Sequence, residues 1–402
     1  MKQKKLMLLG GIRYLLPAIE AAHKHGTHVI TVDYLPNNIA HKYSDEYHNV
    51  SILDKEAILL LAQELQIDGI LSYAVDPGVV TAAYVAEKMG LPFTCSYQTA
   101  TILQDKARFR QFLSDNGFNV PIAKGYSDVE EAMNDVDIFN WPVIVKPVDS
   151  AGSKGVTRVD APEDLQKAIA HALDFSHNGR FIIEDFLELD GYQSSADCFS
   201  INGKLVYADF SDQLFDDDAA NPYTPALEIW PSTMSEDSQK YLTNELQRLL
   251  LLLNCSTGLY NVESRVAKNG KPYIMEVSPR AGGNRIAELQ RIGTGIDLIE
   301  AEVLKAIGNP IVEFGMPHYD GCYVNDILHS KVAGTFNGVY YDKTFSNMNV
   351  ISEAIYPIVG DHVDVFQGAN NAIGSVFLKF DNRNQCDDFL PNLSQFIKVD
   401  VI

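Results

Sequence analysis

The segment from Gly258 to Arg285, GLYNVESRVAKNGKPYIMEVSPRAGGNR, constrains this chain more than any other stretch. Asn269-Gly270 is a strong signal for a two-residue hairpin turn, because a type I′ turn needs positive φ at both central residues. Pairing residues outward from that turn places Glu263 directly opposite Glu276. The sequence therefore predicts a β-hairpin that brings two carboxylates together.

Strand side chains alternate in direction, so the hairpin has two distinct faces. The first face is predicted to carry Glu263, Arg265, Ile274, Glu276 and Ser278. The second, mostly apolar face is predicted to lie on a core and to carry Val262, Ser264, Val266, Tyr273, Met275 and Val277.

Like charges opposed on a sheet destabilise it, whereas a divalent cation between them turns the repulsion into binding. The alternative is a solvated polar face on which Arg265 moderates the charge. We favour a functional site, because local choices that break a folding rule tend to mark such sites.

The residues after the second strand add permanent positive charge. Arg280 follows the carboxylates, and the loop Ala281-Gly282-Gly283-Asn284-Arg285 supplies a second arginine on a backbone able to approach a ligand closely. Arginine is suited to bidentate recognition of carboxylate or phosphate.

Composition excludes several classes of protein. The 402 residues carry a net charge of −21, which disfavours nucleic acid and anionic membranes as partners, so an anionic ligand needs a local cationic pocket. The five scattered cysteines show neither metal-ligand spacing nor a disulfide framework, which fits a reducing cytoplasm. The length predicts roughly two to four domains.

The N-terminal part alternates strands and helices, which predicts a parallel α/β domain over roughly the first hundred residues. Its strands are expected at 5–9, 29–33, 69–72 and near Pro92-Phe93, and its helices at 15–25, 55–65 and 77–89. The opening resembles a Rossmann unit, but Gly10-Gly11-Ile12-Arg13-Tyr14-Leu15 lacks the G-x-G-x-x-G pattern, so we favour a structural βαβ unit over a dinucleotide site.

The next segment contains two lysines and a glycine-containing loop. Lys106 falls in a helix predicted over 99–117, and Lys146 ends a strand predicted over 140–147. The loop Asp149-Ser150-Ala151-Gly152-Ser153-Lys154-Gly155-Val156 follows directly. It is not a P-loop, but such loops can aim several backbone N–H groups at phosphates; the alternative is a flexible hairpin.

The remaining elements are simpler. Strands are predicted at 180–186 and 193–199, and helices at 238–254, 286–290 and 298–306. Asp216 to Asp218 are interpreted as a solvated loop. From about Pro310 the chain is predicted to form a β-rich C-terminal lobe, with turns at Asn337-Gly338 and 357–363.

Taken together, these segments resemble the ATP-grasp superfamily, and within it the carboxylate–amine ligases and carbamoyl-phosphate-synthase-like enzymes, including L-amino acid ligases. The motifs are QDK at 104–106, PVIVKP with SAGSKGV at 142–156, EDFL at 184–187, and VES…MEVSPR at 262–280. The resemblance implies α/β and α+β architecture: a Rossmann-like pre-ATP-grasp domain (1–100), ATP-grasp lobes A (101–185) and B (186–310), and a small β-rich C-terminal lobe (311–402).

The same resemblance implies a nucleotide site. Lys106 and Lys146 would hold ATP phosphates, with Ser150, Gly152, Ser153, Lys154, Gly155 and Val156 folding over them. Glu184, Asp185, Phe186 and Leu187 would form the hinge that reads adenine, and Gln193 would contact the ribose.

Metal and catalytic roles follow from it as well. Glu263 and Glu276 would ligate Mg²⁺ or Mn²⁺. Ser278, where the family usually has Asn, would be a poorer third ligand. Arg280 would steady the acyl phosphate and the oxyanion, and Arg285 would clamp a substrate carboxylate.

The implied function is ATP-dependent ligation of a small carboxylate to an amine through an acyl phosphate, releasing ADP and phosphate. A carbamoyl-phosphate-synthase-like enzyme that phosphorylates bicarbonate or carbamate, and a non-catalytic ATP sensor, are the alternatives. A homodimer is common among proteins that the chain resembles, whereas the expectation of a cytoplasmic protein without nucleic-acid or membrane partners comes from the cysteines and the net charge.

Overall fold

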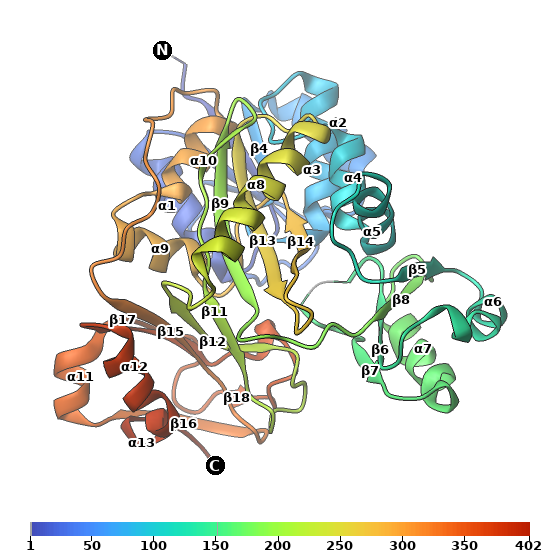
Figure 1. The fold of residues 1–402 in the computed structure, drawn as a ribbon. Helices are drawn as coiled ribbons and strands as arrows, with labels where there is room; N and C mark the ends of the chain where they lie inside the picture. Colours follow the sequence, from blue (N-terminus) through green and yellow to red (C-terminus); the bar gives the residue numbers. More distant parts are fainter. Residues whose placement is uncertain (1, 151) are drawn as a thin grey trace.

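The computed structural model describes residues 2–150 and 152–402, so Ala151 of the predicted phosphate loop lies outside the described residues. Four parts can be followed along the chain in Figure 1. They are an N-terminal α/β domain, a small lobe that projects to one side, a central antiparallel sheet, and a C-terminal lobe at the opposite lower corner.

The N-terminal domain is the predicted parallel α/β unit. Its strands pair in the order β3-β2-β1-β4, all parallel. They are β1 Lys5–Leu9, β2 His28–Val32, β3 Glu46–His48 and β4 Gly69–Leu71, with helices α1 Leu16–Lys24, α2 Lys55–Leu65 and α3 Asp76–Met89. The prediction of a strand near Pro92-Phe93 is wrong, because the backbone there forms no regular secondary structure.

The single helix predicted over 99–117 is two helices, α4 Tyr97–Gln104 and α5 Lys106–Asp115. Asp105 lies between them with an extended backbone, and its carboxylate accepts from the Arg108 N–H at 3.0 Å. Aspartate is a good N-cap, so Asp105 ends one helix and begins the next. The break makes Lys106 the first residue of α5.

The projecting lobe is a four-stranded antiparallel sheet in the order β5-β8-β6-β7. Its elements are β5 Ala123–Tyr126, α6 Val129–Asn134, β6 Val143–Pro147, β7 Thr157–Val159, α7 Leu165–Asp174 and β8 Phe181–Asp185. Helix α7 packs its apolar face on the sheet, and Figure 1 shows the lobe standing away from the rest.

The central sheet has the order β10-β9-β13-β14 and contains the hairpin. Its strands are β9 Ser194–Ile201, β10 Lys204–Tyr207, β13 Gly258–Val266 and β14 Pro272–Ser278. Helix α8 (Glu236–Leu252) packs on one face, with Leu246 and Leu249 in the cluster that contains Val262 and Val277. Helix α10 (Leu298–Ala306) lies between this sheet and the N-terminal domain, whereas α9 (Ile286–Thr294) packs Ile286 and Leu289 against Trp230, Tyr323 and Phe377.

The hairpin turn differs from the prediction, although the carboxylate pairing is as predicted. Ala267 accepts from the Gly270 N–H at 2.8 Å and donates to the Lys271 carbonyl at 3.0 Å, which makes a three-residue loop. Only its last residue, Gly270, has positive φ (75°). A type I turn followed by a left-handed glycine is the usual form of such a loop.

A β-bulge on β14 then restores the predicted register. Glu263 pairs with Glu276 but Ser264 pairs with Ile274, so Met275 is the extra residue. The bulge reverses the faces beyond it. Ile274, predicted beside Glu276, packs instead with Val262, whereas Tyr273 and Met275 leave the predicted core face and pack with Ala267 and Leu187.

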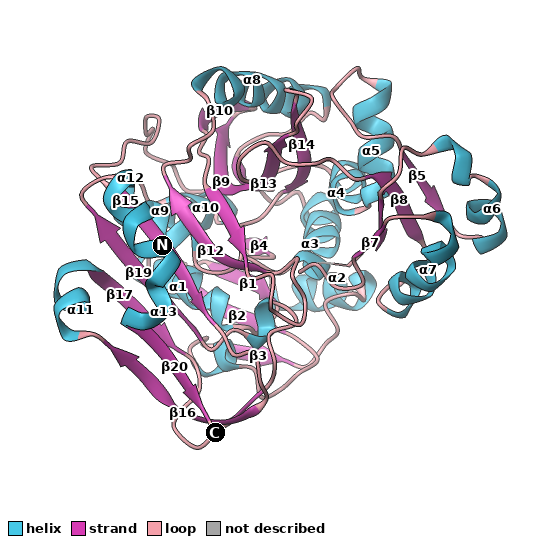
Figure 2. Cartoon of the chain, turned by 60° about the horizontal axis from the view of Figure 1, so that its bottom comes forward, coloured by secondary structure: helices cyan, strands magenta, loops and turns pink. Residues whose placement is uncertain are grey.

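The C-terminal lobe is built on a sheet that begins earlier in the chain. This five-stranded sheet has the order β11-β12-β15-β19-β17, so β11 and β12 cross the predicted boundary at residue 310. The strands are β11 Asp212–Phe215, β12 Pro225–Trp230, β15 Cys322–Leu328, β17 Val350–Ile355 and β19 Gly374–Phe380. Figure 2 shows β15, β19 and β17 on the side of the molecule away from the projecting lobe.

A second, three-stranded sheet completes this lobe. Its strands are β16 Gly334–Tyr341, β18 His362–Val363 and β20 Ile397–Val401, with helices α11 Lys343–Asn349, α12 Arg383–Phe389 and α13 Leu393–Phe396 nearby. The turn predicted at Asn337-Gly338 is wrong: both residues lie inside β16, where Gly338 adopts φ 139° at a register shift. No helix among the described residues is both long and apolar enough to cross a bilayer.

Candidate active site

The opposed carboxylates of Glu263 and Glu276 form the centre of the candidate site. They face each other across β13 and β14, next to the bulge. Burial, followed by the charge of Glu276, raises the pKa of Glu263 to about 7. Burial and mutual repulsion thus disfavour the ionised form of the pair, and a bound cation would stabilise that form.

The donor set fits a hard divalent cation that takes part of its coordination from elsewhere. Among the described residues, no group of three or more His, Cys, Asp or Glu side chains converges on a metal-sized site. Mg²⁺ is commonly held by one or two carboxylates together with water and substrate phosphates. Two opposed glutamates meet that need.

Lys106 reaches the carboxylates from the start of α5. Its Nζ lies 3.3 Å from Glu276 Oε2 and donates to the Ser150 carbonyl at 3.0 Å. Burial acts to lower the pKa of Lys106, but the charges of Glu276, Asp76 and Glu263 outweigh it and raise the pKa. The lysine therefore stays charged between the carboxylates and the glycine-containing loop.

Lys146 is held by a buried ion triad. Its Nζ contacts Glu184 Oε1, and Arg110 Nε donates to Glu184 Oε2 at 2.8 Å. Burial alone would raise the pKa of Glu184, but Arg110 and Lys146 lower it to about 2. Burial, with the nearby cations Arg110 and Lys106, lowers the pKa of Lys146 although Glu184 opposes the change.

Arg110 was missed by the sequence analysis, although it joins the two sheets that form the site. Besides Glu184 on β8, it donates from Nη1 to the Met275 carbonyl of β14 at 2.7 Å. The available signal was its spacing, because residues four apart on a helix share a face and Lys106 precedes it by four. Helix α5 therefore presents both cations to one side.

The loop after β6 is tied to the C-terminal half of the chain. Ser153 Oγ donates to the Tyr223 carbonyl at 2.8 Å. Asn221 Nδ2 donates to the carbonyls of Ser153 at 3.2 Å and Gln367 at 3.1 Å. Ser153 and Gly155 adopt positive φ, whereas Lys154 is exposed. Lys106 and Asn221 thus hold the loop at two points.

The hinge segment after β8 offers backbone groups and an apolar surface. The Glu184 carboxylate is used by Lys146 and Arg110, and Asp185 accepts from Asn140 N at 2.9 Å and Nδ2 at 2.8 Å. Arg158 lies 4.5 Å above the Phe186 ring. Leu187 packs with Met275 and Tyr273. A planar ligand here would meet backbone groups and the Leu187–Met275 surface rather than the two carboxylates.

Gln193, the predicted ribose contact, has both ends of its amide engaged. Its Oε1 accepts from Arg265 Nη2, and its Nε2 donates to Gln213 Oε1 at 2.9 Å. The residue is 7% exposed, so a ribose contact here would have to use the amide's remaining lone pair or N–H.

Ser278 and Arg280 share a partner that the sequence analysis missed, Asp76 at the start of α3. Ser278 Oγ donates to Asp76 Oδ1 at 3.0 Å and accepts from Gln104 Nε2 at 2.6 Å. Arg280 binds Asp76 bidentately, with Nε–Oδ1 at 2.8 Å and Nη2–Oδ2 at 2.7 Å. The Ser278 hydroxyl therefore makes two hydrogen bonds, one as donor and one as acceptor, and keeps one lone pair.

Arg285 lies in a strained part of the loop. It and Asn284 both adopt positive φ, 64° and 51°, a conformation that non-glycine residues adopt rarely and that clusters at functional sites. Arg285 Nε donates to Glu288 at 3.0 Å, and its guanidinium lies 4.2 Å from the Phe377 ring. Its charge is therefore partly neutralised by Glu288.

Comparisons with known proteins show which families and folds the chain resembles. Residues 139–288 match the ATP-grasp domain family. The carbamoyl phosphate synthase large chain of Thermotoga neapolitana is 23% identical over 351 residues, covering 83% of this chain and 31% of the relative. That of Pseudothermotoga lettingae is 25% identical over 317 residues, covering 75% and 28%. The chain thus spans about a third of the length of these curated relatives.

Solved structures resemble the whole chain. The L-amino acid ligase of Bacillus licheniformis has a TM-score of 0.81 at 20% identity, with all of both chains covered. Phosphoribosylglycinamide synthetase of Anaerococcus prevotii has 0.76 at 20%, also with full coverage. The biotin carboxylase domain of Hydrogenobacter thermophilus 2-oxoglutarate carboxylase, solved with MgADP and bicarbonate, has 0.75 at 16%, covering 99% and 91%. These likenesses confirm the predicted fold class.

Proposed function

Because residues 139–288 match the ATP-grasp domain family, we propose that the chain is an ADP-forming ligase that joins a small carboxylate to an amine. One observation carries the proposal. Lys106 Nζ lies 3.3 Å from Glu276 Oε2, and the charges of Lys106 and Lys146 both act to lower the pKa of Glu263. Two cations beside two carboxylates suit a metal–triphosphate group, in which the lysines meet phosphate oxygens and the carboxylates meet the cation.

The nucleotide would lie between the projecting lobe and the central sheet. Lys106, Lys146 and the loop of Ser150, Gly152, Ser153, Lys154, Gly155 and Val156 would hold the phosphates. Asp185 to Leu187 would receive adenine through backbone groups, with Met275 as an apolar base. Glu263 and Glu276 would hold Mg²⁺ or Mn²⁺, which neutralises phosphate charge when bound.

The chemistry needs an activated acid, because a carboxylate has only oxide as a leaving group. Transfer of the γ-phosphoryl to the carboxylate oxygen gives an acyl phosphate, from which phosphate leaves when an amine attacks the carbonyl carbon. Arg280 follows β14 beside Ser278 and would stabilise the charge that develops on the acyl group. Arg285 would bind a substrate carboxylate on release from Glu288.

An acyl phosphate must be kept from water. The bonds of Asn221 to Ser153 and Gln367 close the phosphate loop against the C-terminal half of the chain. We propose that this closed form protects the intermediate, and that the loop opens to exchange nucleotide.

The finer assignments belong to the same proposal. The chain would divide into units 1–100, 101–185, 186–310 and 311–402, although β11 and β12 join the C-terminal sheet. It would act in the cytoplasm on small acids and amines, as a homodimer, without nucleic-acid or membrane partners.

A second candidate activity is phosphorylation of bicarbonate or carbamate. The curated relatives favour it, because they are carbamoyl phosphate synthase large chains. Against it, the chain also resembles an L-amino acid ligase over the full length of both chains, with a TM-score of 0.81. A non-catalytic ATP sensor would not need Glu263, Glu276 and Arg280 together, so we rank it third.

ADP release over a matrix of small acids and amines separates the three. We expect release that requires one acid and one amine together, with an amide as product. Release with bicarbonate alone would replace the ligase with the second activity. Tight Mg-ATP binding without release under any pair would leave only the sensor.

A further inference from the structure

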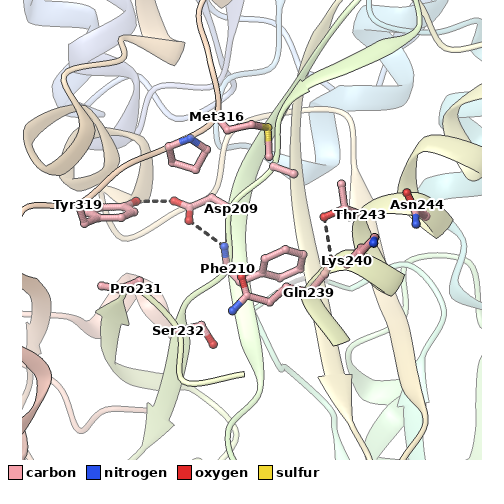
Figure 3. Close-up of a pocket in the computed structure, with 12 residues that line it drawn as sticks. Asp209, Phe210, Pro231, Ser232, Gln239, Lys240, Thr243, Asn244, Met316 and Tyr319 are labelled. Carbon is pink, nitrogen blue, oxygen red and sulfur yellow. Dashed lines mark hydrogen bonds between the residues drawn. The ribbon is translucent and has the colours of Figure 1, made fainter. Parts of the chain in front are cut away.

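A cavity of about 390 Å³ lies apart from the candidate active site, and none of its lining residues belongs to the proposed nucleotide or metal set. It lies where the segment after β10, the first turns of α8 and the linker before β15 meet. Figure 3 shows Asp209 and Tyr319 on one side, and Lys240 and Asn244 of α8 on the other.

Asp209 is a buried carboxylate, and the described groups that donate hydrogen bonds to it are all neutral. Its Oδ2 accepts from Gln290 Nε2 at 2.8 Å, from Tyr207 OH at 3.3 Å and from Tyr319 OH. Its Oδ1 accepts from the Phe210 N–H at 2.9 Å. Burial raises the pKa of Asp209 to about 6, so the group is still mainly ionised at neutral pH. A charge buried to this degree is normally paired, and Oδ1 keeps a free acceptor position.

The rest of the cavity complements that charge. Lys240 is exposed on α8 and supplies a cation on the opposite wall. Apolar surface lies between them, from Phe210 and from Met316, whose side chain is 58% exposed. A negative group, an apolar middle and a positive rim match a ligand with an ammonium, an apolar body and a carboxylate.

We propose that this cavity is a second small-molecule site, for an amino-acid zwitterion: a free amino acid or a dipeptide with an apolar side chain. Its ammonium binds Asp209, its carboxylate meets Lys240, and its side chain covers Phe210 and Met316. Pockets of a few hundred cubic ångströms, mostly apolar with a few placed polar groups, are typical of such ligands. The site does not depend on the proposed ligase activity.

Gln290 gives the cavity a physical connection to the active-site loop. Its Nε2 donates both to Asp209 Oδ2 and to the Asp197 carbonyl, at 3.1 Å. The Asp197 carboxylate accepts from the Gly282 N–H at 2.8 Å. Gln290 therefore links Asp209 to Asp197, whose carboxylate holds the loop between Arg280 and Arg285 at Gly282.

Calorimetric titration of the whole chain without nucleotide tests the site. The probes are L-leucine and L-leucyl-L-leucine, which separate the amino acid from the dipeptide. 4-Methylpentanoate lacks the ammonium and 3-methylbutylamine lacks the carboxylate. We expect one zwitterion to bind and both single-charge analogues to bind at least about tenfold more weakly, as loss of one charged contact predicts.

Variants locate the binding. Lys240→Ala should weaken it about tenfold, and Asn244→Trp, which fills the mouth from an exposed position, should abolish it. Lys167→Ala, an exposed lysine on α7, is the matched control and should bind like the parent chain. Asp209→Asn should lose the ammonium contact, and the two exposed variants decide the matter if it fails to fold. Equal binding by the parent chain and Asn244→Trp, or no binding by either zwitterion at millimolar concentration, would overturn the proposal.

Discussion

The contact between Asp76 and Arg280 allows a demanding test of the site. It joins α3 of the N-terminal domain to the segment after β14, across 204 residues of chain, with two charged hydrogen bonds. The Arg280 side chain is 10% exposed and that of Asp76 is 19% exposed. We predict that Asp76→Asn, which keeps the shape but removes the charge, lowers both stability and turnover.

The size of the stability loss follows from burial. Removing one partner of a buried pair costs about 3–5 kcal/mol, and the partial exposure of Asp76 puts the expected loss near about 3 kcal/mol. Unfolding entropy of about 2.1 cal/mol/K per residue gives about 0.8 kcal/mol/K for 402 residues, so the melting temperature should fall by about 4 °C if unfolding is cooperative. Differential scanning calorimetry measures this shift.

Turnover should fall further than stability suggests, because Arg280 loses its fixed position. We expect the ADP-forming rate to fall about tenfold to a thousandfold, the usual range for one oxyanion contact, with Mg-ATP affinity retained. Asp218→Asn, which breaks the exposed pair with Lys331, is the control and should change neither quantity appreciably. If Asp76→Asn melts and turns over like the parent chain, Asp76 does not position Arg280.

Three further predictions test the nucleotide site. Mg-ATP should raise the melting temperature well above any shift from NAD or NADP, because stabilisation grows as RT ln(1 + [L]/Kd); a larger shift with a dinucleotide would refute the ATP assignment. Lys146→Ala should weaken ATP binding and turnover more than Lys154→Ala, since Lys146 is fixed by Glu184 whereas Lys154 is exposed. Equal small losses in an ATP titration would show that both lysines are ordinary surface residues. Glu276→Gln should nearly abolish ADP formation. The metal-free melting temperature should change little, because relief of repulsion at Glu263 offsets the lost contact with Lys106. A strongly destabilised but active variant would show that the carboxylate pair is structural.

Local sequence signals predicted elements well where one interaction dominates. Helices α2 and α10 have the predicted bounds, 55–65 and 298–306, and the structure shows Asp54 and Asp297 capping their N-termini. The helix across Asp105 was predicted wrongly, because apolar periodicity continues through the break. Only a capping argument, with Asp105 accepting from Arg108, reveals that a new helix begins at Lys106.

Long-range contacts were beyond such signals. Asp76 looks like an ordinary first-turn acid of a helix, yet its carboxylate meets Ser278 and Arg280. Arg110 looks like an exposed helix residue, yet it is 2% exposed and paired with Glu184. The spacing of Arg110 from Lys106 indicates a shared helix face, but no local pattern identifies the distant residue with which a charge pairs, so these partners required the fold.

The hairpin explains how a prediction can reach the right contact through two wrong steps. The loop is one residue longer than predicted, which by itself would move Glu276 out of register with Glu263. The bulge at Met275 shifts the strand back by one residue, so Glu263 and Glu276 pair as predicted. Only the pairs between the bulge and the loop are shifted from the predicted register. Since a one-residue slip moves a strand's side chains to the other face, the bulge is what allows Ile274 and Val277 to enter the core while Glu276 faces Glu263. It also turns Met275 toward Leu187 at the hinge, so a single irregularity sets both the carboxylate pair and the apolar surface proposed for adenine.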